Sequence, residues 1–360
     1  MADGLERLRD TLLVQCRPTE AATALDLAQD SGSGVVVTGR KERRMVLTLA
    51  HLAHRRQVPM LVDADAYAGS SRRRATARFD PAWLDLQREA ELPVLTDSGY
   101  VAHGDVEGLE SVLDQARSLG DVIATLPLDA GWWFDPRHGL TRLLDRVHAA
   151  GVPVALVLEH RGDPYSVART LSGVLQLLRI GVPVLQLRCD VSGLGLLCHG
   201  AHAAAIGTRS SLRHLYPQNG SRPRPGLRAP STVVKDCLSF HTVDRIARAV
   251  QADPDSLLWT GCPCPTCNGR TLDHIATAPE HEQGPRAFGH ALHMLFALRD
   301  GLIGRTVHRA ADAIARQESW REQCSSAAFR FDEIHDAGQA WKVPAFLRNW
   351  RAVPVPSHAT

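Results

Sequence analysis

Short apolar runs alternate with longer amphipathic stretches along the first 210 residues of the chain. Eight runs are rich in β-branched and aliphatic residues, at residues 11–16, 34–39, 58–65, 92–99, 121–129, 152–159, 182–190 and 203–208. The stretches between them, such as VEGLESVLDQARSLG, repeat apolar residues at helical spacing, and several end at a glycine, a frequent C-terminal cap. The pattern therefore predicts strands that alternate with helices.

Alternation of this kind places parallel strands side by side, and eight strand and helix units favour an α/β fold of the (β/α)8 TIM-like barrel type. An open doubly wound sheet is the alternative. No glycine-rich dinucleotide or P-loop motif follows a strand, which argues against those ligands. We expect the barrel over residues 1–215, a basic Pro/Gly/Arg loop over 216–235 and a mainly helical subdomain over 236–360.

Composition narrows the class of protein. The 360 residues are 44% hydrophobic and 22% charged, which is enough apolar material for a full core. No apolar run approaches the length of a membrane span, and the first residues lack the layout of a secretory signal, so we expect a cytoplasmic protein with no membrane partner. Thiols stay reduced in that compartment, and clustered cysteines then indicate metal or redox chemistry.

Charge is distributed unevenly although the net charge is only +2. Residues 191–235 contain no Asp or Glu, and the segment is therefore locally basic. The arginines that we expect to contact nucleic-acid phosphates are Arg209, Arg213, Arg222, Arg224 and Arg228. The alternative is that these side chains are only solvated.

Acidic side chains stand at the C-terminal ends of five of the predicted strands. They are Asp63, Asp65, Asp97, Asp129, Glu159 and Asp190. In a (β/α)8 barrel this end is the face on which active sites are built. Each residue taken alone has a simpler interpretation as a helix cap or a solvated loop residue.

Three cysteines, Cys262, Cys264 and Cys267, lie within six positions in GCPCPTCNG. Thiolates at this spacing can converge on one zinc ion, which needs a fourth ligand to complete a tetrahedron. The candidates are His274, His281, His290 and His293, the last two on one predicted helix. A closed Cys3His site is structural, so we expect zinc to organise the subdomain over 236–360. Three buried thiols without a metal are the alternative.

The chain resembles the tRNA-guanine transglycosylase family at two motifs. The three cysteines followed, after 25 intervening residues, by His293 resemble the zinc motif of that family. The segment PVLTDSG at 93–99 is similar to the family's strand end ILTDSGG. Members are zinc-bearing (β/α)8 barrels that insert queuine or a 7-deazaguanine precursor into tRNA, and relatives insert deazaguanines into DNA. The resemblance implies that His293 is the fourth zinc ligand.

The resemblance also implies roles at the strand ends. Asp97 corresponds to an Asp that acts at the exchanged base, and Ser98 and Gly99 of the same motif would bind substrate. Asp129 and Glu159 fall at or near positions that contact the base. These substrate contacts follow from the resemblance alone.

One position departs from the family. Ala205 stands where the family has its nucleophilic Asp, so another carboxylate has to take that part, and Asp190 on the neighbouring strand is our candidate. Base exchange needs a carboxylate at C1′ and an acid for the departing base, and we assign Asp97 and Asp190 to this catalytic pair.

The sequence thus predicts an enzyme that replaces guanine by a 7-deazaguanine in tRNA or DNA. The expected partners are the nucleic acid, the deazapurine base, and a second copy of the chain or another family member. A catalytically inactive family member that binds nucleic acid or a partner subunit is the alternative, motivated by Ala205. A third interpretation is an unrelated zinc-supported barrel enzyme that acts on a small purine-like molecule.

Overall fold

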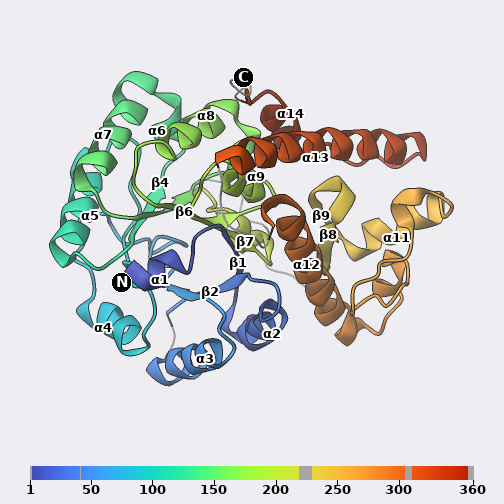
Figure 1. Cartoon of the computed structure of the whole chain (residues 1–360), viewed down its shortest axis with the longest axis horizontal. Coiled ribbons are helices and arrows are strands. Elements are labelled where there is room, and N and C mark those ends of the chain that lie inside the picture. The colour runs from blue at the N-terminus through green and yellow to red at the C-terminus, as the bar shows by residue number, and fades with distance from the viewer. Residues whose placement is uncertain (1, 41, 219–228, 305–309, 356–360) are drawn as a thin grey trace. The chain divides into compact units, whose positions relative to one another are not determined.

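The computed structural model describes residues 2–40, 42–218, 229–304 and 310–355, which form two compact units, Met1–Ser221 and Arg222–Thr360 (Figure 1). The boundary falls inside the basic loop predicted over 216–235. Residues 216–218 belong to the first unit, whereas 231–234 form a strand of the second unit and are not loop. The remainder of that loop, 219–228, lies outside the described residues.

A seven-stranded parallel sheet forms the centre of the first unit, with the strand order β3-β2-β1-β7-β6-β5-β4. The strands are β1 Thr11–Cys16, β2 Gly34–Thr38, β3 Met60–Asp63, β4 Ala124–Leu128, β5 Val154–Leu158, β6 Val184–Cys189 and β7 Ala203–Gly207. Every strand residue is buried, which explains why these strands read as continuous apolar runs. Seven of the eight predicted runs are thus strands.

The remaining run, residues 92–99, does not form a strand, so the predicted eight-stranded barrel is not confirmed. Leu95 makes one parallel bridge with Ile123 next to β4. On its other side, the buried side chain of Gln87 accepts a hydrogen bond from Leu95 N at 2.9 Å and donates one to Leu95 O at 2.9 Å. The amide of Gln87 therefore satisfies the backbone groups of Leu95 that a neighbouring strand would use.

The sheet is curled. Arg188 of β6 and Asp63 of β3 are four positions apart in the strand order, a separation of about 19 Å in a flat sheet. In the structure Nε of Arg188 lies 3.9 Å from Oδ2 of Asp63. The curl also gathers Leu61 of β3, Leu95 and Leu187 of β6 into one buried core on the inner face. The first unit is therefore an α/β fold with a half-barrel of parallel strands.

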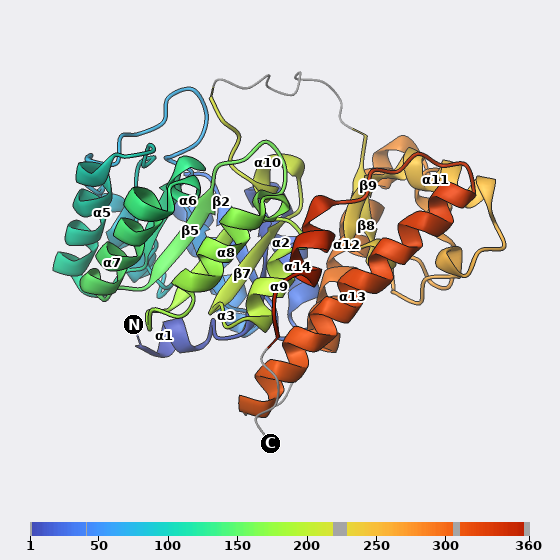
Figure 2. The same cartoon turned by 90° about the horizontal axis from the view of Figure 1, so that it is seen from above.

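Helices surround this sheet (Figures 1 and 2). They are α1 Ala2–Glu6, α2 Pro18–Ala28, α3 Arg43–Arg55, α4 Pro81–Glu89, α5 Val106–Leu119, α6 Gly131–Phe134, α7 Thr141–Ala150, α8 Ala168–Leu177, α9 Gly193–Cys198 and α10 Ser210–Arg213, with short helices η1 Pro136–Leu140 and η2 Pro164–Ser166. Asp105 caps the start of α5 through Gly108 N, and Gly120 ends it at φ 75°. Local sequence thus sets both ends of this helix.

The second unit is mainly helical. It consists of the antiparallel strands β8 Ser231–Val234 and β9 Ser239–Thr242, the helices α11 Val243–Ala252, α12 Glu280–Ile303, α13 Ala310–Asp336 and α14 Ala345–Arg351, and the short helices η3 Lys235–Cys237, η4 Leu257–Trp259 and η5 Leu272–Ile275. Trp320 and Trp350 pack edge to face with centroids 5.9 Å apart between α13 and α14. In the described parts of the chain, no helix combines the length and the apolar character needed to cross a membrane.

Candidate active site and metal centre

Four buried side chains of the second unit converge on one point. The sulfurs of Cys262, Cys264 and Cys267 and a nitrogen of His290 all lie within 4.8 Å of one another. Nδ1 of His290 is 3.7, 3.6 and 3.2 Å from the three sulfurs in that order. The prediction of His293 as the fourth ligand is wrong, because this group contains His290, one turn earlier on α12.

The backbone of the cysteine loop directs the sulfurs inward. Cys262 N donates to Arg270 O at 2.9 Å and Gly269 N donates to Cys262 O at 2.8 Å, which closes the loop. Cys267 N donates to Cys264 O at 3.0 Å. Gly269 has φ 78°, a left-handed conformation that glycine adopts without strain. The loop therefore holds its three thiols together by backbone hydrogen bonds.

The spacing of the four donors fits a tetrahedral metal ion. Typical zinc bond lengths place a sulfur and a nitrogen of a tetrahedral site about 3.6 Å apart, close to the distances observed here. Nε2 of His290 lies 3.0 Å from Val233 O of β8, so it donates there and leaves the Nδ1 lone pair directed at the sulfurs. Hydrogen bonding from Cys267 lowers the pKa of Cys264 to about 3, which favours a thiolate. This cluster could hold a metal ion.

At the carboxyl end of the curled sheet, Asp97 is buried and held by arginines. Its Oδ2 forms ion pairs with Arg40 and Arg73, and its Oδ1 accepts a hydrogen bond from Asp80 N at 3.0 Å. The Asp97 side chain is 0% exposed. The predicted catalytic residue is thus at the expected edge, but its oxygens are engaged by neighbours from other loops.

Ser98 and Gly99, predicted to bind substrate, are both buried. The hydroxyls of Ser98 and Thr96 lie 2.7 Å apart, and Thr96 Oγ1 accepts a hydrogen bond from Thr125 N of β4. A Cβ at Gly99 would clash with the backbone of Arg74. These residues are therefore packed into the end of the run at 92–99.

Asp129 and Glu159 meet at one tyrosine. The hydroxyl oxygen of Tyr100 lies 2.8 Å from Oδ2 of Asp129 and 2.7 Å from Oε2 of Glu159. The Arg72 guanidinium lies 4.3 Å from the centre of the Tyr100 ring and donates to Oε1 of Glu159 at 2.6 Å. Burial, together with these carboxylates, raises the pKa of Tyr100 and keeps its hydroxyl protonated. Tyr100 thus connects the predicted site residues Asp129 and Glu159. Neither Tyr100 nor Arg72 was identified as a site residue from the sequence.

Asp190, at the end of β6, faces Arg213 and Asp163. Its Oδ2 is 3.4 Å from Nε of Arg213, and the Asp190 side chain is 22% exposed. Burial and the nearby charge of Asp190 raise the pKa of Asp163 to about 7. Oδ1 of Asp163 accepts a hydrogen bond from Tyr165 N at 2.8 Å and caps η2. Asp163 is therefore an additional acid at this edge that the strand-end pattern did not identify.

The predicted catalytic pair is not a contacting pair. Asp97 lies in the run beside β4 and Asp190 directly follows β6, three positions further along the strand order. That separation corresponds to about 14 Å along the sheet edge. Asp97 pairs with Arg40 and Arg73, whereas Asp190 pairs with Arg213. A bound substrate would therefore have to span the distance between the two carboxylates.

The position on β7 at which the resemblance implied a nucleophile has no carboxylate, and the strand end has no space for one. Ala205 is fully buried in the inner core of the sheet. Gly207 is the next residue with the same orientation, and a Cβ there would clash with the backbone of Leu212 and Arg213. A nucleophile on this strand is thus excluded by its packing.

Two of the predicted phosphate-binding arginines lie in the described chain, and they differ in exposure to solvent. Arg213 is buried and paired with Asp190, so its predicted role in binding phosphate is not supported by its environment. Arg209 is largely exposed and pairs with Glu20 at 2.8 Å. Arg222, Arg224 and Arg228 lie outside the described residues.

A further buried network lies at the same edge on the side of β3. Arg188 forms ion pairs with Asp63 and Asp65, and Tyr67 donates to Asp63 at 2.6 Å. Arg188 and Asp65 have φ values of 49° and 58°, unusual for residues other than glycine. Gln15 of β1 accepts a hydrogen bond from Arg188 N at 2.6 Å. This network ties the end of β6 to the end of β3.

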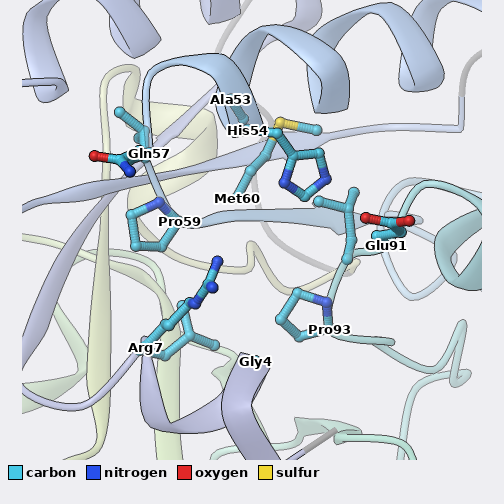
Figure 3. Close-up of a pocket in the computed structure, with 12 residues that line it drawn as sticks. Gly4, Arg7, Ala53, His54, Gln57, Pro59, Met60, Glu91 and Pro93 are labelled. Atoms are coloured by element: carbon cyan, nitrogen blue, oxygen red, sulfur yellow. The ribbon is translucent and has the colours of Figure 1, made fainter.

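A pocket of about 500 Å³ opens at the opposite, amino end of the sheet, where β3 begins and the run at 92–99 fails to pair with it. Arg7 and Gln57 lie on one side and Glu91 and Pro93 on the other (Figure 3). None of the predicted site residues lines it. Parallel α/β sheets bind ligands at the carboxyl ends of their strands, and this pocket lies at the other end.

Comparison of the chain with known protein families finds no family model that matches it, and comparison with curated proteins finds no significant match.

Proposed function

We propose that the protein is a transglycosylase-like enzyme that replaces guanine by a 7-deazaguanine in tRNA or DNA. The observation that carries this proposal is the array of four carboxylates at one edge of the curled sheet, Asp97, Asp129, Glu159 and Asp190. Exchange of a base needs both a carboxylate at C1′ and a proton donor for the departing base, and this edge offers both kinds of group.

Asp190 is the best candidate for the carboxylate that faces C1′. It is 22% exposed, whereas the side chain of Asp97 is 0% exposed and bound by two arginines. Nε of Arg213, 3.4 Å from Oδ2 of Asp190, would orient this carboxylate toward a bound substrate. Asp97 instead orients Arg40 and Arg73, which are partly exposed and suited to a phosphate of the bound strand.

Asp129 and Glu159 would recognise the base. Guanine presents two adjacent N–H donors on its Watson–Crick edge, and a flipped base is commonly read through that edge. Carboxylate oxygens of Asp129 and Glu159, held 2.8 and 2.7 Å from the Tyr100 hydroxyl, are suitable acceptors. Adenine has an acceptor at the corresponding ring position, so this arrangement would favour guanine.

For the metal cluster we propose zinc. Three thiolates and an imidazole are the donor set of closed zinc sites, and Cys262, Cys264, Cys267 and His290 would hold the ion. A zinc ion bound there would supply a structural cross-link between the cysteine loop and α12, and no open position for catalysis remains.

The exchange assay tests the proposal directly. Transfer RNA and duplex DNA carrying radiolabelled guanine are incubated with the purified chain and unlabelled 7-deazaguanine, and loss of label is followed. We expect label to be lost from one polymer with the wild type, and Asp190→Ala to slow the loss by at least about 1,000-fold. Asp114→Ala on the exposed face of α5 is the matched control. Exchange that survives in Asp190→Ala would refute the assigned nucleophile.

A non-catalytic family member that binds nucleic acid is the second candidate. The observation that favours it is β7, where Ala205 is buried and Gly207 leaves no space for a side chain. This candidate predicts salt-dependent binding of tRNA or DNA without exchange of label. Measuring both binding and exchange with tRNA and with duplex DNA therefore distinguishes the two functions.

A further inference from the structure

We propose that residues 68–72, in the long loop after β3, form a strap that closes the acidic edge of the sheet in the free protein and is held there by Arg72. The closed contact does not depend on the function proposed above. The choice of nucleic acid as the ligand that opens the strap rests on that function.

The loop between β3 and α4 is unusually long. It covers residues 64–80, whereas loops from a strand to the next helix in α/β folds usually have about 2–6 residues. Loops of more than about 12–15 residues in a compact fold are commonly lids or binding loops. Figure 2 shows this loop, in light blue, standing above the sheet at the edge where α10 lies. Its length and position are those of a segment that covers a site.

Arg72 fastens the strap to the opposite side of this edge. Its guanidinium donates to Oε1 of Glu159 at 2.6 Å and to Tyr216 O. The same group lies 4.3 Å from the centre of the Tyr100 ring. The side chains of Arg72 and Glu159 are only 7% and 9% exposed. Arg72 therefore covers Glu159, and a base cannot pair with this carboxylate while the strap is closed.

Gln218 makes a second contact with the strap. Its Nε2 donates to Gly69 O at 2.9 Å, and both residues are exposed to solvent. The chain just before Gln218 belongs to the edge of the sheet, because Leu215 forms a parallel bridge with Glu159. The strap is thus attached to this edge by the side chains of two residues, Arg72 and Gln218.

The loop is fixed on both sides of the strap. Before it, Tyr67 is buried and donates to Asp63 at 2.6 Å. After it, Arg73 O accepts a hydrogen bond from Tyr100 N at 2.9 Å, and a Cβ at Gly99 would clash with the Arg73 backbone, which shows how closely the loop is packed there. Loss of the contacts of Arg72 and Gln218 would therefore free residues 68–72 while the rest of the loop stays in place.

A phosphate group is a suitable competitor for Arg72. Arginine binds carboxylate and phosphate through the same forked set of donors. Arg73 and Arg74 follow directly and add to the local positive charge, which attracts a nucleic-acid backbone. A ligand that binds Arg72 only when the strap is open shifts the strap to that state. Binding of the polymer would thus uncover Glu159 for the base.

Distances between two spin labels test the strap without any substrate. All eight native cysteines are buried, so labels can be placed at Ser70→Cys on the strap and at Asp145→Cys on the exposed face of α7. Pulsed electron paramagnetic resonance measures the distribution of distances between the labels. We expect one narrow distribution in this doubly labelled protein, because the strap is held closed. A broad distribution in the free protein would overturn the proposal.

Variants identify the residues that hold the strap. Arg72→Ala should broaden the distribution, and so should Gln218→Ala at its exposed position. Arg74→Ala is the matched control, since it removes the same charge from an exposed residue of the same run. Labels at Asp114→Cys and Asp145→Cys, on α5 and α7, show whether each variant is folded.

A narrow distribution in folded Arg72→Ala would overturn the proposal. If Arg72→Ala does not fold, a narrow distribution in Gln218→Ala has the same consequence. Equal broadening in Arg74→Ala would also overturn it, because loss of charge and not loss of the contact with Glu159 would then move the strap.

Nucleic acid separates this proposal from the proposed function. The doubly labelled protein is titrated with tRNA and with duplex DNA, and binding is followed by fluorescence anisotropy. We expect the polymer that binds to broaden or displace the distribution, as Arg72→Ala does. A polymer that binds and leaves the distribution narrow would overturn the proposed opening. If neither polymer binds although Arg72→Ala frees the strap, the strap is retained and the nucleic-acid function is rejected.

Discussion

Burial raises the pKa of the Asp163 carboxyl group into the neutral range. Its pKa of about 7 exceeds the usual value of an unfolded Asp, about 3.9, so the folded state binds the proton more tightly. The stabilisation from this proton is complete below the unfolded pKa and is lost as pH rises through the folded pKa. Asp163 therefore makes the protein less stable at pH 8 than at pH 5.

Asp163→Asn should remove that part of the pH dependence. Asn keeps the cap of η2, because its side-chain oxygen can still accept from Tyr165 N. We expect the variant to gain on the order of 2 kcal/mol in free energy of unfolding relative to the wild type between pH 5 and pH 8. Urea unfolding at both pH values measures the gain. Parallel curves for the two proteins would contradict the assigned pKa shift.

His290 and His293 provide a matched pair for the metal centre. We expect His290→Ala to lose the bound metal from a chain that otherwise carries about one ion, because a tetrahedral site needs its fourth ligand. His293→Ala should keep the metal, since His293 is not among the converging donors. Elemental analysis of both purified variants measures the metal content. Loss of metal in His293→Ala alone would restore the ligand predicted from the resemblance.

These two histidines also show which part of the metal site the sequence alone does not determine, namely the fourth ligand. The three cysteines could be recognised from their spacing, because a short loop brings nearby residues together. The histidine could not, since both candidates lie on one helix, one turn apart. The rotation of α12 decides between them, and contacts with β8 set that rotation, including Thr232 Oγ1 to Ala287 O at 2.8 Å and His290 Nε2 to Val233 O at 3.0 Å.

At the scale of elements, the strands were predictable because both faces of the sheet are buried. A residue with no exposed face has to be apolar, so seven strands appear as uninterrupted apolar runs. The run at 92–99 begins with a similar apolar segment but does not form a strand. The difference is the side chain of Gln87, which binds both Leu95 N and Leu95 O from outside the run.

Gln87 therefore contributes to the stability of the sheet as a neighbouring strand would. Gln87→Leu keeps the volume of the side chain and leaves two buried backbone groups of Leu95 unpaired. We expect the free energy of unfolding to fall by about 3 kcal/mol. Chemical unfolding measures this change, with Gln176→Leu on the exposed face of α8 as the control. An equal, small effect in both variants would show that the Leu95 backbone finds other partners.

The arginine partners of the strand-end acids were not predictable from local sequence. Arg72 and Arg73 lie in SSRRRATAR, a basic run that the sequence alone predicts to contact phosphates, with solvated side chains as the alternative. In the folded chain Arg72 binds Glu159, 87 residues away, and Arg73 binds Asp97, 24 residues away. The pattern of strand ends correctly placed the acids at one edge, but pairing across the curled sheet depends on how the strands are ordered.

At the scale of the whole molecule, the charge distribution leads to a prediction about nucleic-acid binding. Arg222, Arg224 and Arg228 lie in the acid-free segment, whereas Arg213 is committed to Asp190. If the first three contact phosphates of duplex DNA, changing all three to Ala should reduce the slope of log affinity against log salt by about 2.7. Fluorescence anisotropy at several salt concentrations measures the slope. Arg117→Ala, on an exposed face of α5, should change neither slope nor affinity.

The most direct test of the proposed function is the nucleoside composition of a nucleic acid after reaction. Transfer RNA and duplex DNA are each incubated with the purified chain and a 7-deazaguanine, digested to nucleosides and analysed by mass spectrometry. We predict a 7-deazaguanine nucleoside in one of the two polymers, with an equal loss of guanosine or deoxyguanosine, and neither change with Asp190→Ala. Unaltered nucleosides in both polymers, with a folded and metal-loaded wild type, would contradict the account.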